Sequence, residues 1–394
     1  MNTNHSPEIS VLLMACAVEL SPEKKIQLVQ FLEQHQLNWS RFYTLAVRHR
    51  VTPFLYRTLQ DIPTIPEAFL TTLQNDCRTI ATDNLVKLHQ YKLLAKRLTD
   101  NAIDHIPLKG IYLATNCYPD SSLRSIGDLD VLVAKEDVFR SVHLLEADGY
   151  HPDKKSTLYT KYNEQIMLSD LYEISLIKPF FNNSYFDLDL HWEFMCFNKH
   201  YKMYDLHEVL SRPELAIEFQ IILLVTHHGV TGVWQTINYI NDLYFLVHNQ
   251  AIDWPWLLQE LHRNGLERVF LVGLFWCQQI WELSVPSSVQ EMLANKEISL
   301  LANAYEKNWE NSEPIASSTL ILAQLTFFLR AQTQFSKQLK VVATFCTSRI
   351  IQYSTFRVGK RVLYIPKQLG IISVFIRAIR SLLRFIPVLR EPLR

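Results

Sequence analysis

The first hundred residues carry hydrophobic positions at helical spacing. Ser21-Pro22-Glu23 is typical of a helix start, with Ser as the N-cap and Pro at the first helical position. Residues 39–60 predict one or two further helices, interrupted near Pro53, and residues 67–99 predict one long helix. We therefore expect this part of the chain to be helical.

The pattern changes near residue 103, where short apolar runs predict strands over 103–108 and 126–134. Helices are expected over 110–117 and 136–147. Two more strands are expected over 159–168 and 172–178, and Asn182-Asn183-Ser184 predicts a turn that folds 172–192 into a hairpin. From residue 205 to the end the pattern is helical again, with helices over 214–227 and 233–248 separated by a break at 229–232.

This order of elements predicts an α+β fold, with a small sheet core embedded in a mostly helical chain. We expect an N-terminal helical region (1–100), the sheet core (101–200), a helical domain over the cleft (201–310) and a C-terminal helical region (311–394). The length of 394 residues allows two or three domains, or one large core with helical additions. Only nine residues are Gly, which favours helices and argues against Gly-rich phosphate loops.

Acidic residues recur on the predicted strands. Asp128 and Asp130 are two residues apart, so on a strand both would point to the same face. A third acid, Asp189, falls on the second strand of the hairpin, and Asp187 shares its face as an alternative. Adjacent carboxylates repel each other unless a cation lies between them, and converging carboxylates suit Mg²⁺, which also contacts substrate phosphates. The pattern indicates phosphoryl or nucleotidyl transfer; a half-exposed strand with its polar face in water is the alternative.

Composition narrows the function further. Lys plus Arg equals Asp plus Glu at 39 each, so the formal net charge is zero, which argues against nucleic acid as a partner. The six cysteines include no C-x-x-C pair, as expected for reduced thiols. The sequence shows no signal peptide and no apolar run of the roughly 20 residues that a membrane span needs. We therefore expect a cytoplasmic location.

The last stretch of the sequence is basic. Residues 357–394 carry nine Lys and Arg residues against one Glu. Arg377, Arg380 and Arg384 would form one stripe on a helix, next to an apolar face. This stripe could touch an anionic surface such as a lipid, an acidic substrate or an acidic partner, or it could belong to a helix docked on the core with its cations in water.

Four motifs follow one another along the chain: Leu108-Lys109-Gly110, Tyr118-Pro119, Arg124-x-x-Gly127-Asp128-x-Asp130 and Asp189-Leu190-His191-Trp192. Together they resemble the motifs of an uncharacterised bacterial nucleotidyltransferase family within the polymerase-β-like nucleotidyltransferase superfamily. Flanking segments are also similar to the family: Trp39 with His49-Arg50-Val51-x-Pro53, and His227-His228 with Asp242. The similarity covers residues from about 40 to 310, and the combination of motifs is far more specific than any one of them.

The resemblance implies Mg²⁺-dependent transfer of a nucleoside monophosphate from an NTP, with ATP as the expected donor, to a small-molecule or peptide acceptor, releasing pyrophosphate. Asp128 and Asp130 would hold one or two Mg²⁺ ions against the triphosphate, and Asp189 would complete a metal site. Asp189 or a metal ion would help to deprotonate the acceptor. Gly110 would allow close approach of the backbone to phosphate, and Lys109 and Arg124 would clamp phosphate charge.

Given the resemblance, His191, His228 and Asp242 are candidates for an acceptor cleft, and His191 could also orient an acid. His191 and Asp242 each have a structural alternative. His191 could simply support the sheet, and Asp242 could lie on a solvated helix face with Gln235 and Asn238, since these positions share one stripe.

One departure motivates a second hypothesis. Superfamily enzymes commonly carry Ser after the phosphate-turn Gly, but here Ile111 follows Gly110. A catalytically inactive binding or partner protein that keeps the nucleotidyltransferase fold is therefore the alternative function. A kinase-like phosphotransferase is a weaker third, because the chain lacks both the G-x-x-x-x-G-K-[ST] and the G-x-G-x-x-G motif.

Overall fold

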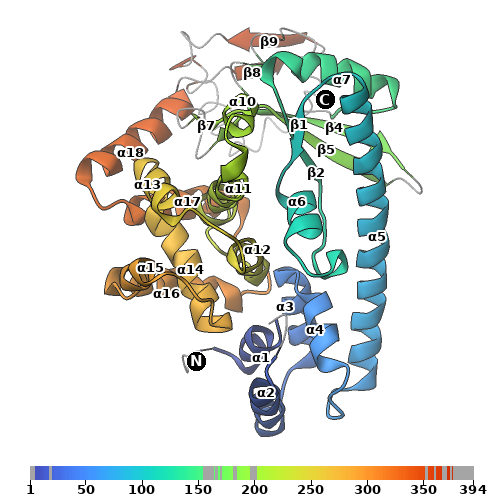
Figure 1. Ribbon diagram of the computed structural model, residues 1–394, viewed down its shortest axis with the longest axis vertical. Coiled ribbons are helices and arrows are strands. Elements are labelled where there is room, and N and C mark those ends of the chain that lie inside the picture. The colour runs from blue at the N-terminus through green and yellow to red at the C-terminus, as the bar shows by residue number, and fades with distance from the viewer. Residues whose placement is uncertain are drawn as a thin grey trace, which may run out of the picture.

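A computed structural model describes residues 5–16, 20–153, 164, 167–168, 171–180, 184–195, 202–350, 354–358, 361–365, 371–372 and 375. Five helices precede the sheet: α1 (Pro7–Ala15), α2 (Pro22–Gln34), α3 (Trp39–His49), α4 (Thr52–Leu59) and α5 (Glu67–Asp100). With 34 residues, α5 is about 50 Å long at 1.5 Å per residue. It runs from the N-terminal helices at one end of the molecule to the sheet at the other (Figure 1).

Local signals place the N-terminal helix boundaries. Ser21 caps α2 by accepting a hydrogen bond from the Lys24 N–H, with Pro22 in the first turn, as predicted. The break in 39–60 falls at Arg50, whose φ of 55° is left-handed and ends α3. Pro53 lies in the first turn of α4, where it displaces no intrahelical hydrogen bond. The interruption therefore precedes Pro53, and the segment forms two helices.

The central sheet has five strands in the order β1-β2-β5-β4-β3. They are β1 (His105–Pro107), β2 (Leu129–Val133), β3 (His151–Pro152), β4 (Glu173–Pro179) and β5 (Tyr185–His191). Strands β2 and β5 are parallel, and the other neighbouring pairs are antiparallel. The predicted hairpin over 172–192 is confirmed as β4 and β5. The remaining elements of this region are α6 (Lys109–Asn116), η1 (Ser121–Leu123), η2 (Lys135–Asp137) and α7 (Val138–Ala147).

The two faces of the sheet differ in polarity because side chains alternate along each strand. Leu129 and Val131 of β2 and Leu188 and Leu190 of β5 join a hydrophobic cluster with α5 and α7. Asp130 and its neighbours on β4 and β5 point to the opposite face. The apolar face of the sheet therefore packs on α5 and α7, and the opposite face carries the polar side chains.

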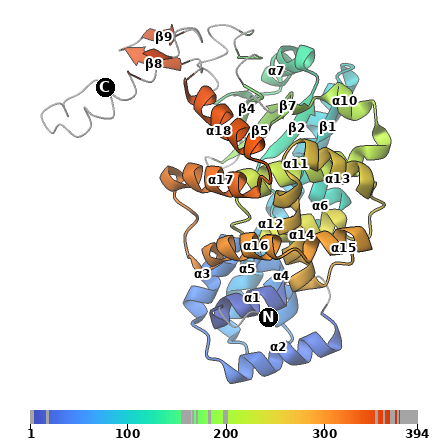
Figure 2. The same ribbon diagram turned by 90° about the vertical axis from the view of Figure 1, so that its left-hand side faces the viewer.

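Helices and short strands follow the sheet. They are β6 (Phe194–Met195), β7 (Lys202–Tyr204), α10 (Leu206–Leu210), η4 (Pro213–Leu215), α11 (Ala216–Leu224), η5 (Val225–Thr231), α12 (Ile237–Val247), α13 (Trp254–Arg263), α14 (Glu267–Trp281), α15 (Ser287–Leu293), α16 (Lys296–Glu306), η6 (Lys307–Glu310), α17 (Ser317–Ala331), α18 (Phe335–Ile350), β8 (Ser354–Val358) and β9 (Arg361–Ile365). Figure 1 shows α14 and α16 on the side of the molecule opposite α5, and Figure 2 looks onto that side. A second and larger hydrophobic cluster combines α1–α4 and the start of α5 with α10–α18.

Three predictions from the hydrophobic pattern are wrong. The chain is not helical to its end, because β8 and β9 pair as an antiparallel hairpin; they are rich in β-branched and aromatic residues, which favour strands. The helix predicted over 233–248 begins only at Ile237, because Val233 and Trp234 have positive φ angles of 51° and 49°. Within 159–168 only residues 164, 167 and 168 are described, and all three are helical rather than extended.

The strand predicted over 126–134 is shorter than expected. It begins at Leu129, so Asp128 lies in the bend just before it. The basic stripe of Arg377, Arg380 and Arg384 lies outside the described residues. Within the part of the chain that the structure describes, no helix is both long enough and apolar enough to cross a membrane.

Candidate functional site

A cavity of about 680 Å³ opens over the polar face of the sheet. Seven of the residues singled out from the sequence line it: Lys109, Gly110, Arg124, Asp128, Asp130, Asp189 and His228. Arg50, Asp187 and His227 line it too. Of the remaining predicted residues, His191 is buried beside Asp130, and Asp242 is buried behind Arg124 and His228.

Strand register brings the central acids together. Asp130 on β2 is the direct partner of Asp189 on the parallel strand β5. Ligand atoms of Asp130, Asp189 and His191 all lie within 4.8 Å of one another. Asp187 is not part of this group, although it lines the same cavity. The sheet thus juxtaposes two carboxylates and an imidazole at one point.

Asp130 is held by two donors. Its Oδ1 accepts hydrogen bonds from Lys109 Nζ at 2.7 Å and from His191 Nε2 at 2.8 Å. Burial alone would raise the pKa of Asp130, but the ammonium of Lys109 and the imidazole of His191 lower it below its usual range. The carboxylate is therefore ionised and already partly neutralised by Lys109.

Asp189 has a different environment. Burial raises its pKa to about 6, opposed by a hydrogen bond of 2.6 Å that Ser175 Oγ donates to its Oδ1. Negative charge on Glu173 and Asp130 raises the pKa further. The two adjacent acids differ because Lys109 compensates the charge of Asp130, whereas Asp189 is buried beside other negative charge.

The start of α6 also faces the cavity. Lys109 has a φ of 42°, a left-handed conformation that is unusual for a residue with a side chain and costs on the order of 1 kcal/mol. A Cβ on Gly110 would lie 3.0 Å from Arg124 Nη1. A larger residue here would press on Arg124, which would have to shift by a few tenths of an ångström. That Lys109 and Arg124 contact phosphate stays a prediction.

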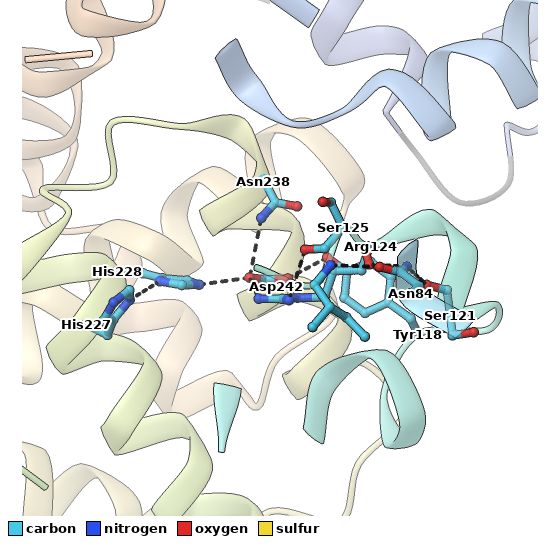
Figure 3. A network of polar contacts seen from close by, with 10 residues as sticks. Asn84, Tyr118, Ser121, Arg124, Ser125, His227, His228, Asn238 and Asp242 are labelled. Carbon is cyan, nitrogen blue, oxygen red and sulfur yellow. Dashed lines mark hydrogen bonds and ion pairs between the residues drawn. The ribbon is translucent and has the colours of Figure 1, made fainter. Parts of the chain in front are cut away.

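Arg124 makes a bidentate pair with Asp242, as Figure 3 shows. Its Nε and Nη2 donate to Asp242 Oδ1 and Oδ2 at 2.9 and 3.0 Å. Asp242 also accepts hydrogen bonds from Tyr118 at 2.6 Å and from His228 Nε2 at 2.8 Å. Asp242 is fully buried, as Asn238 and Gln235 nearly are, so the solvated-face interpretation of this stripe is wrong.

Asn84 of α5 fastens the loop that carries Arg124. Its amide nitrogen donates to the carbonyls of Ser121 and Arg124 at 2.7 and 2.8 Å, and its oxygen accepts from the Ile126 N–H at 2.9 Å (Figure 3). A buried Asn that makes three hydrogen bonds to one loop fixes the path of that loop. The hydrophobic pattern of α5 gave no indication of this role.

The π-helical turn η5 carries His227 and His228. Helical hydrogen bonding continues through Gly229 and ends at Thr231, one residue before Gly232. Both glycines are packed tightly against other helices. A Cβ on Gly229 would lie 2.4 Å from Val269, and one on Gly232 would lie 2.4 Å from the ring of Tyr239. The predicted break at 229–232 is therefore present but begins later than expected: the chain leaves helical geometry after Thr231 and becomes helical again at Ile237. π-helical turns are frequent at functional sites.

Sequence reasoning missed several residues at this site. Glu173 and Ser175 flank Asp189 and His191 in the β4–β5 register, and His191 Nδ1 lies 3.3 Å from Glu173 Oε2. The predicted turn at 182–184, combined with alternation along both strands, was a signal that could have found them. His227 was noted only as part of a resemblance, although it lines the cavity.

One protein-family model matches this chain. The model of a family described as uncharacterised nucleotidyltransferase covers residues 35–282, well over half of the chain. The protein belongs to this nucleotidyltransferase family. No curated protein and no solved structure matches it. Family membership supports nucleotidyl transfer as the general reaction and an NTP as substrate, and such enzymes commonly use divalent metal ions.

The matched range contains every residue of this nucleotidyltransferase's cavity that was named above. It also contains α3 and α12, which meet through His49. His49 Nδ1 accepts from the Ile237 N–H at 3.1 Å, and its Nε2 donates to the Trp309 carbonyl at 2.9 Å. His49 therefore joins α3, which precedes the sheet in sequence, to α12 and η6, which follow it.

Proposed function

We propose that this chain is a Mg²⁺-dependent nucleotidyltransferase. It would move a nucleoside monophosphate from an NTP, with ATP as the expected donor, to a small-molecule or peptide acceptor, and release pyrophosphate. The observation that carries the proposal is the direct pairing of Asp130 with Asp189 across β2 and β5. The pairing sets two carboxylates side by side at the wall of a cavity large enough for a nucleotide.

The donor set fits Mg²⁺, which prefers oxygen ligands. Asp130 and Asp189 would supply carboxylate oxygens, and Asp128 lines the same cavity one bend earlier. A bound Mg²⁺ would offset the charge of the triphosphate and of the departing pyrophosphate. Lys109, released from Asp130, would be able to bind a phosphate oxygen as an ammonium donor. The α6 N-terminus would add partial positive charge at the same place.

The first experiment is thermal unfolding with ATP, GTP, CTP and UTP, each with and without Mg²⁺. A nucleotide at 100 times its Kd should stabilise the protein by about 2.7 kcal/mol. We expect wild type to show the shift only with Mg²⁺, Asp189→Asn to lose it, and Asp100→Asn to keep it. Asp100 is a suitable control because it lies exposed on α5, where it pairs with Lys96. A shift that does not need Mg²⁺, or that survives Asp189→Asn, would contradict the proposed metal site.

The ion pair of Lys109 with Asp130 favours one alternative, a nucleotidyltransferase fold that binds a ligand without catalysis. In that case Lys109 neutralises Asp130 permanently, and no metal is required. The thermal experiment separates the two functions, because a non-catalytic binding protein would show no Mg²⁺-dependent shift with any nucleotide. Lys109→Met would then leave Asp130 with His191 as its hydrogen-bond partner but without an ammonium partner, and would destabilise the protein without any effect of Mg²⁺.

A further inference from the structure

A chain of three side chains leads from the buried interior to the cavity. Asp242 Oδ2 lies 2.8 Å from His228 Nε2, and His228 Nδ1 lies 2.9 Å from His227 Nδ1. Figure 3 shows the three residues in line, with His227 at the outer end. His227 and His228 line the cavity, whereas Asp242 is fully buried.

Hydrogen-bond geometry assigns the protons along this chain. Asp242 also accepts from Arg124 and Tyr118, and the guanidinium keeps its pKa low against the effect of burial, so it is an ionised acceptor. His228 Nε2 must therefore donate to it. Burial lowers the pKa of His228 despite Asp242, so its ring is neutral and its Nδ1 carries a lone pair.

The same logic fixes the tautomer of His227. Its Nδ1–H has to donate to the lone pair on His228 Nδ1, because two lone pairs cannot share a hydrogen bond. Burial and the nearby ammonium of Lys109 lower the pKa of His227, which keeps the ring neutral. Its Nε2 is then unprotonated, and it has no hydrogen-bond partner among the residues that the structure describes.

Charged and titratable groups surround His227 on several elements. Lys109 of α6, Asp130 of β2 and His191 of β5 all influence its charge. From α12, the ring of Tyr239 packs edge-on at a centroid distance of 6.5 Å and stacks on His228 at 4.0 Å. His227 therefore shares the cavity with the acids proposed to hold the metal.

We propose that His227 Nε2 is the base that takes the proton from the acceptor's attacking group, and that His228 and Asp242 are positioning residues that act through it. This inference rests on the proposed function, and it names an acceptor class: a neutral hydroxyl or amine that must lose a proton as it attacks. The proposed function uses the two carboxylates as Mg²⁺ ligands, and each also has one engaged oxygen. Asp130 Oδ1 is engaged by Lys109 and His191, and Asp189 Oδ1 by Ser175.

The proposed step conserves atoms and charge. The acceptor oxygen or nitrogen forms a bond to the α-phosphorus, while the bond from that phosphorus to the bridging oxygen breaks and pyrophosphate leaves with the electron pair. The acceptor proton moves to His227 Nε2. The resulting positive charge is shared by transfer of the Nδ1 proton to His228, whose imidazolium is stabilised by Asp242. The proton then leaves to solvent through His227.

A chemical test of the tautomer needs no acceptor. Diethyl pyrocarbonate modifies unprotonated, accessible ring nitrogens, and mass spectrometry locates the adduct. At pH 7 we expect wild type to be modified at His227 and not at His228, whose two ring nitrogens are both engaged. The exposed His143 of α7 serves as the reactivity control. Modification of His228 with an unreactive His227 would overturn the inference.

The catalytic test uses His227→Asn, whose amide can still donate to His228 but offers no base to the cavity. The assay is pyrophosphate release from Mg²⁺–ATP with water or methanol as acceptor, at pH 6.5 to 9. We expect unchanged Mg²⁺–ATP binding and a rate at least about 100-fold lower, the usual contribution of a general base. The residual rate should rise with pH as hydroxide replaces the missing base, while wild type stays flat. His143→Asn should match wild type.

The outcomes separate the two proposals. Pyrophosphate release by His227→Asn within threefold of wild type, with the same pH profile, overturns the role of His227 and leaves the proposed function standing. Wild type that neither binds Mg²⁺–ATP nor releases pyrophosphate overturns both. Wild type that binds Mg²⁺–ATP but turns over neither acceptor leaves the decision to the diethyl pyrocarbonate result.

Discussion

Asp242→Asn should destabilise the protein severely, although the substitution preserves size and shape. Asp242 is fully buried and accepts four short hydrogen bonds, two from Arg124 and one each from Tyr118 and His228. Unit charges about 4 Å apart attract by about 4 kcal/mol at an effective dielectric constant of about 20. Removing one member of a buried pair also leaves the other charge without a partner. We expect a loss of about 3–5 kcal/mol in the free energy of unfolding.

The measurement is equilibrium urea unfolding followed by tryptophan fluorescence and circular dichroism, arranged as a double-mutant cycle with Arg124→Gln. The double variant should lose about 1–3 kcal/mol less than the sum of the single variants, because it leaves no unpaired charge. Asp100→Asn is the matched control, since it breaks an exposed pair with Lys96 and should cost no more than about 0.5 kcal/mol. Equal losses for Asp242→Asn and Asp100→Asn, or strict additivity in the cycle, would refute the reasoning.

Two further predictions concern residues that hold the site in place, Gly110 and His49. Gly110→Ala should lower the free energy of unfolding by about 1–3 kcal/mol and weaken nucleotide binding, because its Cβ would press on Arg124 Nη1 at 3.0 Å. Gly127→Ala is the control and should be neutral, because nothing lies within 4 Å of a Cβ at that position. Equal effects of the two substitutions would argue against the steric explanation. Burial lowers the pKa of His49 to about 3. Between pH 6.5 and 3 the unfolded chain therefore binds one more proton at this residue than the folded protein does. The free energy of unfolding should fall by up to about 1.4 kcal/mol per pH unit as the pH drops through that range. His49→Gln should remove that share of the slope in urea titrations at several pH values, and an unchanged slope would count against a neutral His49.

Local periodicity predicted the part of the site that lies on adjacent strands. Alternation along a strand placed Asp130 with the polar face, and a turn signal placed Asp189 on the second strand of a hairpin. Both features depend on residues close together in sequence. The confirmed α+β class follows from the same short-range signals, since strand and helix periods change visibly near residue 103.

Contacts between distant segments could not be predicted in this way. Arg124 and Asp242 are separated by 118 residues, and a helical stripe shows only which residues share a face, not what packs against that face. For the same reason Gly229 and Gly232 were interpreted as breakers. Gly232 does follow the end of η5, but Gly229 lies inside it, and the small size of both admits Val269 and Tyr239, which belong to other helices. The strands β8 and β9 were missed because the basic residues around them dominated the pattern.

The hydrogen bond between His49 and Trp309 has a consequence for co-translational folding. The two residues are 260 positions apart. At a translation rate of roughly 5–20 residues per second, the Trp309 carbonyl is synthesised about 13–52 s after α3. During that time the apolar sides of α1, α3 and α4 lack the helices that later cover them. The nascent chain should therefore depend on a chaperone that shields exposed hydrophobic surface until α16 and η6 have emerged.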